Sequence, residues 1–230
     1  MTTKLPLSLA GIQPQGLVQD QTIAQYHLGS QKNFVYLILN WQTHEAAMID
    51  PQFDIETPLQ ALQENGFELR FILLTHTHGD HTAGVPGLLR KFPELPVYLH
   101  SEDAHRLRSS EPPFQFLHEG QNLKLGDFEI QPLHTPGHSA GALSYFLKAE
   151  RPYLFTGDTI FIRDCGRTDF PTGDNQQMFD SIQKIKKLPL ETVFLPGHFY
   201  APQCATTLEL ELKESPPFKC HTVQELSTLA

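Results

Sequence analysis

Short apolar runs recur along the chain and are separated by glycine, proline and polar residues, so the pattern predicts strands mixed with modest helices. The expected strands span residues 34–41, 46–49, 71–74, 97–99, 127–133, 143–147, 153–155 and 192–195. The expected helices span residues 57–65, 84–91, 101–107, 175–187 and about 205–213. Because strands come first in runs and then alternate with helices, we expect mixed sheets that are covered by helices.

Local signals predict where two of these elements begin or end. Thr57 is expected to cap the helix that follows it, with Pro58 at the first helical position and Gly66 just past the end. Gly126 and Asp127 separate two apolar runs, and such a dipeptide is typical of a hairpin turn.

Length and composition narrow the class of protein. The 230 residues are 40% hydrophobic and 19% charged, an ordinary globular balance, and we expect one domain over residues 1–230. The formal net charge of −9 repels phosphate backbones and anionic lipid, so neither nucleic acid nor a membrane is an expected partner. The apolar run at residues 34–39 is too short to span a bilayer, and no signal or transit peptide is evident, so we expect a cytoplasmic protein. Three scattered cysteines fit neither a disulfide framework nor a cysteine-type zinc site.

Four of the expected strands are each followed at once by a loop that carries histidine or aspartate. These side chains are His76, His78, Asp80 and His81 after residues 71–74, His138 after residues 127–133, Asp158 after residues 153–155, and His198 after residues 192–195. If the strands share a sheet sandwich, the four loops can meet at one edge, where a rigid sheet positions a site. Glycine precedes His138, Asp158 and His198, which fits a sharp turn at each strand end.

The residue types in these loops indicate a metal site. Imidazole nitrogen suits zinc, iron and other borderline ions, and carboxylate oxygen binds or bridges them. Four donors within six residues, in the order His-x-His-x-Asp-His, are rare by chance, whereas a lone loop histidine is usually solvated or a capping group. That ordinary interpretation applies to the histidines that receive no role, which are His27, His44, His100, His105, His118 and His221. His134 is expected to point along its strand as a packing group or a group that orients a ligand.

Over about residues 22–200 the sequence resembles the metallo-β-lactamase superfamily, whose signature is His-x-His-x-Asp-His. The resemblance implies an α+β fold, a four-layer αββα sandwich with the metal site at the edge of its two sheets. Members of that superfamily can hold two metals with seven ligands. The corresponding residues are His76, His78 and His138 for one ion, Asp80, His81 and His198 for the other, and Asp158 as the bridge. The spacing alone permits a site with one metal or with two.

The run Cys-Gly-Arg-Thr-Asp-Phe at residues 165–170 resembles the persulfide dioxygenases of that superfamily. The resemblance implies a single Fe(II) per chain, held by His76, His138 and Asp158, at which glutathione persulfide reacts with O2 to give sulfite and glutathione. Two histidines and one carboxylate leave three positions open for the sulfur and the dioxygen, and zinc lacks the redox chemistry for this reaction. The remaining donors would then orient the ligands through hydrogen bonds, and these are His78, Asp80, His81 and His198.

Three further residues are expected near the substrate. In the family, an arginine at the position of Arg167 and a tyrosine at the position of Tyr200 contact glutathione. The alternatives are an ion pair of Arg167 with Asp169 or Asp164, and simple packing of Tyr200. Cys165 is expected close to the substrate or buried as a small apolar side chain, and it is not assigned as a nucleophile because nothing indicates a lowered pKa.

The alternative activity is that of a hydroxyacylglutathione hydrolase, a thioesterase of the glyoxalase II type with two zinc, iron or manganese ions and a bridging hydroxide. The complete set of seven ligands favours this reaction. Only about 30 residues follow Tyr200, which is too few for the C-terminal helical domain with which long members of that group hold glutathione. The tail is divergent, and nothing is carried over to it. Relatives often form dimers, so a homodimer is an open expectation.

Overall fold

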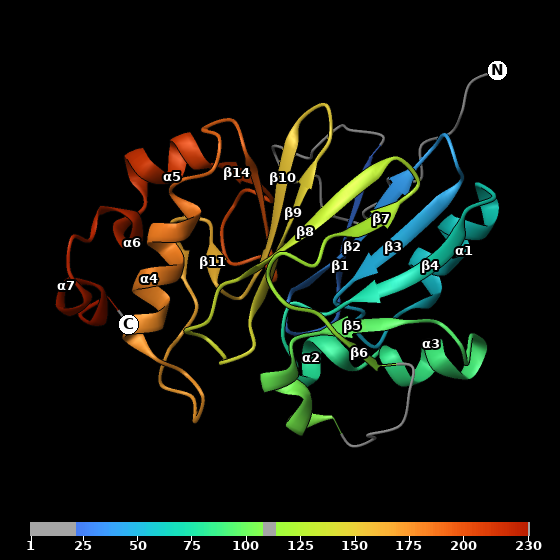
Figure 1. Cartoon of the computed structure of the whole chain (residues 1–230), viewed down its shortest axis with the longest axis horizontal. Coiled ribbons are helices and arrows are strands. Elements are labelled where there is room, and N and C mark those ends of the chain that lie inside the picture. The colour runs from blue at the N-terminus through green and yellow to red at the C-terminus, as the bar shows by residue number, and fades with distance from the viewer. Residues whose placement is uncertain (1–21, 108–113, 230) are drawn as a thin grey trace.

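The computed structural model describes residues 22–107 and 114–229, and two six-stranded sheets form its centre (Figure 1). The first sheet has the order β1-β2-β3-β4-β5-β6. Its strands are β1 (Ile23–Leu28), β2 (Asn33–Asn40), β3 (Glu45–Ile49), β4 (Glu68–Leu73), β5 (Val97–Leu99) and β6 (Phe114–Phe116). The second sheet has the order β14-β13-β10-β9-β8-β7. Its strands are β7 (Leu123–Leu125), β8 (Phe128–His134), β9 (Leu143–Lys148), β10 (Pro152–Gly157), β13 (Val193–Pro196) and β14 (Thr206–Thr207).

Helices and one small hairpin complete the described part of the chain. The helices are α1 (Glu56–Glu64), α2 (Gly79–Thr82), α3 (Val85–Lys91), α4 (Asn175–Ile185), α5 (Leu208–Glu214), α6 (Pro216–Lys219) and α7 (Val223–Ser227), with a 3₁₀ helix η1 over Ser101–Arg106. The hairpin pairs β11 (Ile160–Phe161) with β12 (Asp164–Cys165).

The central core lies between the two sheets, because side chains alternate between the faces of a strand. Phe34 and Tyr36 of β2 belong to the cluster that also contains inward-facing residues of the second sheet, whereas Val35 and Leu37 belong to an outer cluster. That outer cluster includes Leu62 of α1 together with side chains of α3. Both faces of β2 are therefore covered, which explains why all eight of its residues are buried.

A third apolar cluster covers the outer face of the second sheet. Met178 and Ile182 of α4 pack there with Leu154 of β10, and α5, α6 and α7 contribute further side chains. Figure 1 shows α4 to α7 on one side of the two sheets and α1 and α3 on the other. The layers are thus helix, sheet, sheet and helix, and the predicted αββα fold is confirmed.

The ends of some elements differ from the sequence prediction. Gly126 and Asp127 do connect β7 and β8 as an antiparallel hairpin, with Gly126 in the left-handed region at φ 59°. The prediction that Thr57 caps α1 is wrong, because the helix begins at Glu56 and its N-cap position is held by Ile55 without a side-chain cap. Ile55 is buried in the outer cluster, and its carbonyl accepts a hydrogen bond from the Leu59 amide at 3.1 Å, so the helical bonding starts there.

Two expected helices change type or length. Residues 101–107 were expected as a helix and form the 3₁₀ helix η1 over Ser101–Arg106. The helix expected at about residues 205–213 starts only at Leu208, because Thr206 and Thr207 pair with β13 as strand β14. The side chain of Thr207 then caps α5 by accepting a hydrogen bond from the Leu210 amide.

Strand β1 is absent from the sequence prediction because a buried polar residue interrupts its apolar pattern. Gln25 is only 3% exposed, and its amide nitrogen donates to the Tyr36 hydroxyl at 3.1 Å and to the Cys204 carbonyl at 2.9 Å. These bonds offset the cost of burying the amide. The short elements β6, β11, β12, α2, α6 and α7 were also not predicted, whereas β7 was expected only as the run before the hairpin turn.

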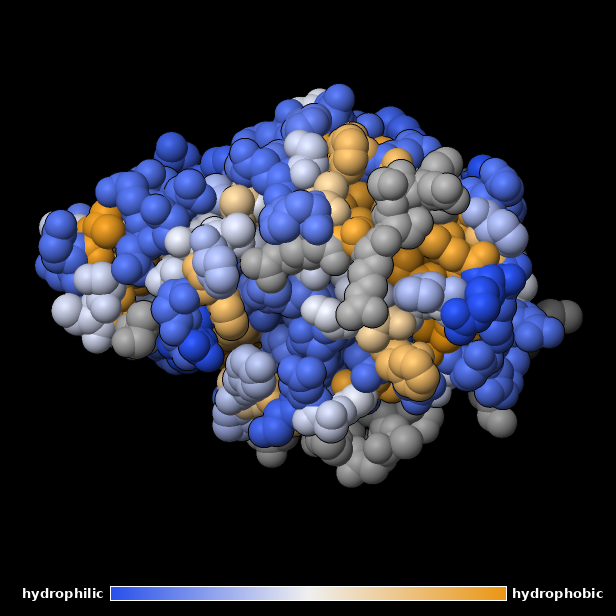
Figure 2. Space-filling view, turned by 90° about the horizontal axis from the view of Figure 1, so that it is seen from below, coloured by the Kyte–Doolittle hydropathy of each residue, from blue (hydrophilic) through white to orange (hydrophobic). Residues whose placement is uncertain are grey.

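One face of the molecule shows how polar and apolar side chains are distributed on the surface. Figure 2 shows a face on which hydrophilic side chains predominate and apolar ones form limited patches between them. Among the described residues, the helices are all too short or too polar to cross a lipid bilayer.

Ion pairs of Arg163 with one buried and one exposed glutamate join the β11–β12 hairpin to α5. Its turn contains Arg163, whose backbone adopts the left-handed region at φ 65°. The guanidinium donates to the carboxylate of Glu211, which is fully buried, and to Glu214 at 2.6 Å. The Arg163 amide also donates to Glu211 at 3.0 Å. The last helices of the chain therefore hold this hairpin in place.

Replacing Glu211 by alanine is expected to lower the free energy of unfolding by about 1.5–3 kcal/mol, because charge-assisted hydrogen bonds to Arg163 are lost. Chemical denaturation of the variant and the parent measures the difference. The matched control is Glu209→Ala, an exposed glutamate of the same helix, which should change stability by less than about 1 kcal/mol. Equal effects of both substitutions would contradict the role given to Glu211.

Candidate metal centre

Four loops that follow strands meet at one edge of the sandwich. The segment after β4 carries the first four donors, of which Asp80 and His81 lie in α2, and the loops after β8, β10 and β13 carry one donor each. Because β4 belongs to the first sheet and the other three strands to the second, the donors converge from both sheets. The structure brings together all seven residues singled out in these loops, which are His76, His78, Asp80, His81, His138, Asp158 and His198.

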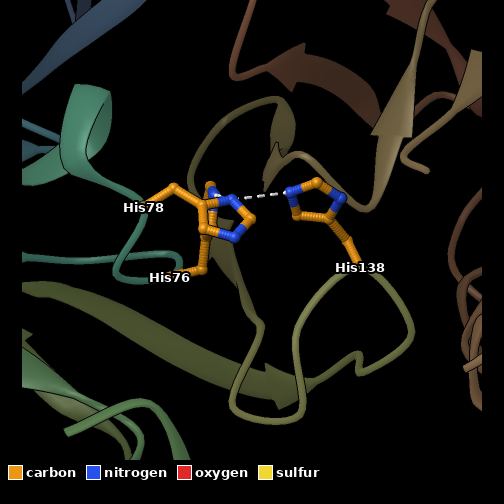
Figure 3. Close-up of side chains that lie close together, drawn as sticks. All are labelled: His76, His78 and His138. Atoms are coloured by element: carbon orange, nitrogen blue, oxygen red, sulfur yellow. Dashed lines mark hydrogen bonds between the residues drawn. The ribbon is translucent and has the colours of Figure 1, made fainter. Parts of the chain in front are cut away.

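Three imidazoles form the first cluster (Figure 3). The Nε2 atoms of His76 and His138 each lie 3.0 Å from Nδ1 of His78. All three ring nitrogens therefore point toward one another. Such a spacing suits three ligands of one ion, since nitrogen ligands bind zinc at about 2.0–2.1 Å.

Asp80, His81 and His198 form the second cluster. The Nε2 atoms of His81 and His198 are 3.1 Å apart. Oδ2 of Asp80 lies 3.5 Å from the first of these nitrogens and 3.4 Å from the second. This set offers two imidazoles and a carboxylate to a second ion.

Asp158 lies between the two clusters. Its Oδ1 is 3.4 Å from Nε2 of His81, and its Oδ2 is 3.3 Å from Nε2 of His198 and 3.6 Å from Nε2 of His138. Oδ1 is buried and has no hydrogen-bond partner among the described residues. A buried carboxylate oxygen without a partner is costly, so this arrangement fits a bound cation.

Two glycines beside Asp158 leave no space for a side chain. Gly157 has φ 50°, and a Cβ atom there would lie 2.4 Å from the Thr75 hydroxyl. A Cβ atom on Gly197 would lie 2.3 Å from Oδ1 of Asp158 itself. The glycine in front of Asp158 therefore serves the turn, whereas the one in front of His198 serves close approach.

The outward-facing ring nitrogens are fixed by acceptors, which directs the other nitrogen of each ring to the centre. Nδ1 of His138 donates to the Arg167 carbonyl at 2.8 Å, and Nδ1 of His198 donates to the Gln31 carbonyl at 2.9 Å. Nδ1 of His81 lies 3.0 Å from a carboxylate oxygen of Asp50.

Asp50 is a site residue that the sequence analysis missed. Besides orienting His81, its carboxylate accepts from the Thr75 amide at 2.7 Å and from the Thr75 hydroxyl at 2.5 Å, so it holds the start of the ligand loop. Asp50 itself has φ 49° and is almost fully buried. It follows β3 at once, as the other donors follow their strands, and that position was the available signal.

Burial and mutual charge set the protonation of the centre. Burial lowers the pKa of His76 and of His138, which keeps both imidazoles neutral and able to bind a metal. Burial also lowers the pKa of His81, but Asp158 and Asp50 outweigh it and raise that pKa to about 9. For Asp158, burial would raise the pKa, yet the charge of His81 holds it well below its usual range. The carboxylate is therefore ionised.

A cleft of about 550 Å³ opens onto the centre. It is lined by donors of the centre and by Cys165, Arg167 and Tyr200, the three residues expected near the substrate. The ring of Tyr200 stacks on His198 with centroids 4.7 Å apart, while 59% of the residue stays exposed. Tyr200 thus both packs on a donor and faces the opening.

Arg167 makes the ion pair that was one of its two expected roles. Its Nε and Nη2 donate to the two carboxylate oxygens of Asp169 at 2.9 and 2.7 Å, and Asp169 rather than Asp164 is the partner. The guanidinium also lies 5.0 Å from the ring centre of Phe170. Burial raises the pKa of Cys165 to about 12, so this side chain is a neutral thiol and is not an activated nucleophile.

Comparisons with known proteins agree with this geometry. Residues 30–198 match the metallo-beta-lactamase superfamily. The chain is 36% identical over 170 residues to the hydroxyacylglutathione hydrolase of Enterobacter sp. (strain 638). The matched region covers 74% of this chain and 63% of that protein. This chain therefore spans less than two thirds of the length of that relative.

Two solved structures are also similar. ETHE1 from Myxococcus xanthus superposes with a TM-score of 0.79 and 29% identity, covering 90% of this chain and 88% of that one. The protein TTHA1623 in a di-iron-bound form gives a TM-score of 0.70 and 31% identity, covering 84% of this chain and 98% of that one.

Asp158→Ala is expected to remove more than half of the bound metal, because both clusters lose the carboxylate that lies between them. Elemental analysis of the purified, metal-loaded variant measures the metal-to-protein ratio. The control is Asp164→Ala, an exposed aspartate that lines the same cleft and should leave the ratio unchanged. Full metal content in the Asp158 variant would contradict the site.

Proposed function

We propose that this chain, which belongs to the metallo-beta-lactamase superfamily, is a metal-dependent hydrolase of thioesters between glutathione and a hydroxyacyl group. The observation that carries the proposal is the Asp158 carboxylate between two clusters of three donors each. The name and 36% identity of the Enterobacter relative support the substrate class. Of the two reactions predicted from the sequence, the comparisons favour this one.

We assign two metal ions to the centre. His76, His78 and His138 would hold one ion, Asp80, His81 and His198 the other, and Asp158 would contribute to both. When bound, such ions supply Lewis acidity and lower the pKa of water to near neutrality. The chain itself keeps the donors in place, because Asp50 and the carbonyls of Gln31 and Arg167 fix the rings of three histidines.

The cleft supports binding of an acidic substrate. Glutathione carries two carboxylates, and among the described residues that line the cleft Arg167 is the one with a permanent positive charge. Asp169 occupies its Nε and Nη2, so Nη1 can donate to a substrate carboxylate. The aromatic rings of Phe161, Phe170 and Tyr200 would pack against the apolar parts of the substrate.

A second candidate function is the oxidation of glutathione persulfide by O2 at one Fe(II) held by His76, His138 and Asp158. The observation that favours it is the position of Cys165 in the cleft wall beside Arg167, in the run that resembles persulfide dioxygenases. The match to ETHE1 covers 90% of this chain and 88% of that one. This reaction would use His78, Asp80, His81 and His198 only to orient ligands.

Two assays on the same protein distinguish the two reactions. The metal-loaded protein is expected to hydrolyse S-lactoylglutathione without oxygen uptake, and protein stripped by a chelator should lose at least nine tenths of this activity. An oxygen electrode measures the response to glutathione persulfide. Oxygen consumption with sulfite formation, together with no thioester hydrolysis, would contradict the hydrolase and favour the dioxygenase.

Arg167→Ala is expected to raise KM for the glutathione thioester about tenfold or more, because charge-assisted hydrogen bonds contribute about 1.5–3 kcal/mol. The turnover number and the metal content should stay close to those of the parent. Steady-state kinetics with parallel metal analysis tests this, and Arg151→Ala serves as the exposed control outside the cleft. Loss of metal from the Arg167 variant would show a structural role instead.

A further inference from the structure

A second group of histidines lies one strand away from the metal centre. His100 follows β5 as His76 follows β4, and these two strands are parallel neighbours. His118 comes shortly after β6, which is parallel to β5, and His134 is the last residue of β8. We call His100, His118 and His134 the outer histidine cluster. No role was expected for the first two, and the third was expected to pack or to orient a ligand.

One pair of ring nitrogens in the outer histidine cluster is spaced like the facing nitrogens of the main centre. Nδ1 of His118 lies 3.2 Å from Nε2 of His100, whereas the facing nitrogens of the main centre are 3.0–3.1 Å apart. The rings of His100 and His134 stack nearly parallel, at 13° with centroids 4.3 Å apart, which differs from the rings of His76, His78 and His138, whose planes cross at 82–87°. His100, His134 and the carboxylate of Glu102 also place ligand atoms within 4.8 Å of one another.

The orientation of His134 matches that of a metal ligand. Its Nε2 donates to the Ala140 carbonyl at 2.8 Å, which leaves the lone pair of a neutral ring on Nδ1. His138 and His198 in the main centre are also held by backbone carbonyls, there through Nδ1 instead of Nε2. An imidazole fixed by a carbonyl acceptor is the usual partner arrangement for a metal-binding histidine.

The side chains of the outer histidine cluster and Glu102 differ in solvent exposure. His100 is buried, and this burial, followed by the charges of His134 and His118, lowers its pKa and keeps it neutral. His118 and Glu102 are exposed, so both side chains can turn toward an ion that arrives from solvent. Glu102 would add one negative charge to three neutral ligands.

We propose that the outer histidine cluster, together with Glu102, binds one divalent transition-metal ion of the zinc class, separate from the main centre. Three imidazoles and a carboxylate without a thiolate suit such an ion. The ion takes the place of the proton that links His100 and His118. The proton of His100 then moves to Nδ1, which gives up the long 3.4 Å hydrogen bond from the Glu102 amide.

An ion at this position would brace the loops of the main centre. Asp103 follows Glu102 and is fully buried, and its carboxylate accepts from Ser139 Oγ at 2.7 Å and from the Gly141 amide at 2.9 Å. The Asp103 carbonyl accepts from Thr77 Oγ1 at 2.9 Å. Ser139 adjoins His138, and Thr77 lies between His76 and His78 in the chain.

Zinc titration of the full-length protein tests the proposal. The chain is first loaded with zinc, freed of excess metal, and then titrated with zinc chloride by calorimetry, with elemental analysis of the product. The wild type is expected to bind one more zinc ion per chain than His118→Ala. The control His221→Ala removes an exposed histidine of the C-terminal segment and should bind as much as the wild type.

His118 is exposed, so its replacement should leave folding intact, and the melting temperature without added zinc checks this. A second variant, His100→Gln, should lose the same zinc ion. Equal zinc stoichiometry and affinity in wild type and His118→Ala would overturn the proposal, as would an equal loss in His221→Ala. The readout is the zinc bound by the outer histidine cluster and not catalysis, so failure of the proposed hydrolase activity does not affect the outcome.

Discussion

The site depends on keeping an ionised carboxylate buried. Asp158 sits at the end of a buried strand and is surrounded by imidazoles from three other loops. A buried charge is expensive unless opposite charges or metal ions compensate it. Two nearby residues fit this requirement: Gly197 leaves room for the carboxylate, and Asp50 holds His81 toward it.

The architecture explains how donors far apart in sequence reach this carboxylate. One sheet supplies the ligand loop after β4, and the other supplies the loops after β8, β10 and β13. The core between the sheets fixes their relative position, so the loops start from strand ends that are held rigidly. The pocket wall has a different support, because the β11–β12 hairpin with Cys165 is held by Arg163 and Glu211. The two regions meet at Arg167, whose side chain lines the cleft and whose carbonyl fixes His138.

Much of this could be predicted from the sequence, since apolar strands and the donors that follow them are local signals. The αββα fold is confirmed, and all seven donors lie together. What failed depends on tertiary contacts. Strand β1 was not predicted because it contains the polar residue Gln25, which is buried through hydrogen bonds to Tyr36 and Cys204. Helix α1 starts one residue before the expected Thr57, with the buried Ile55 at its N-cap. Asp50 was missed because it orients a ligand through a contact 31 residues along the chain.

The number of metal ions is the central claim, because it separates the hydrolase from the dioxygenase. Anomalous diffraction from crystals of the metal-loaded protein would locate each ion directly. We expect two peaks on either side of Asp158, one beside His76, His78 and His138 and the other beside Asp80, His81 and His198. A single peak bound by His76, His138 and Asp158, with no ion near His81 and His198 at saturating metal, would contradict the account.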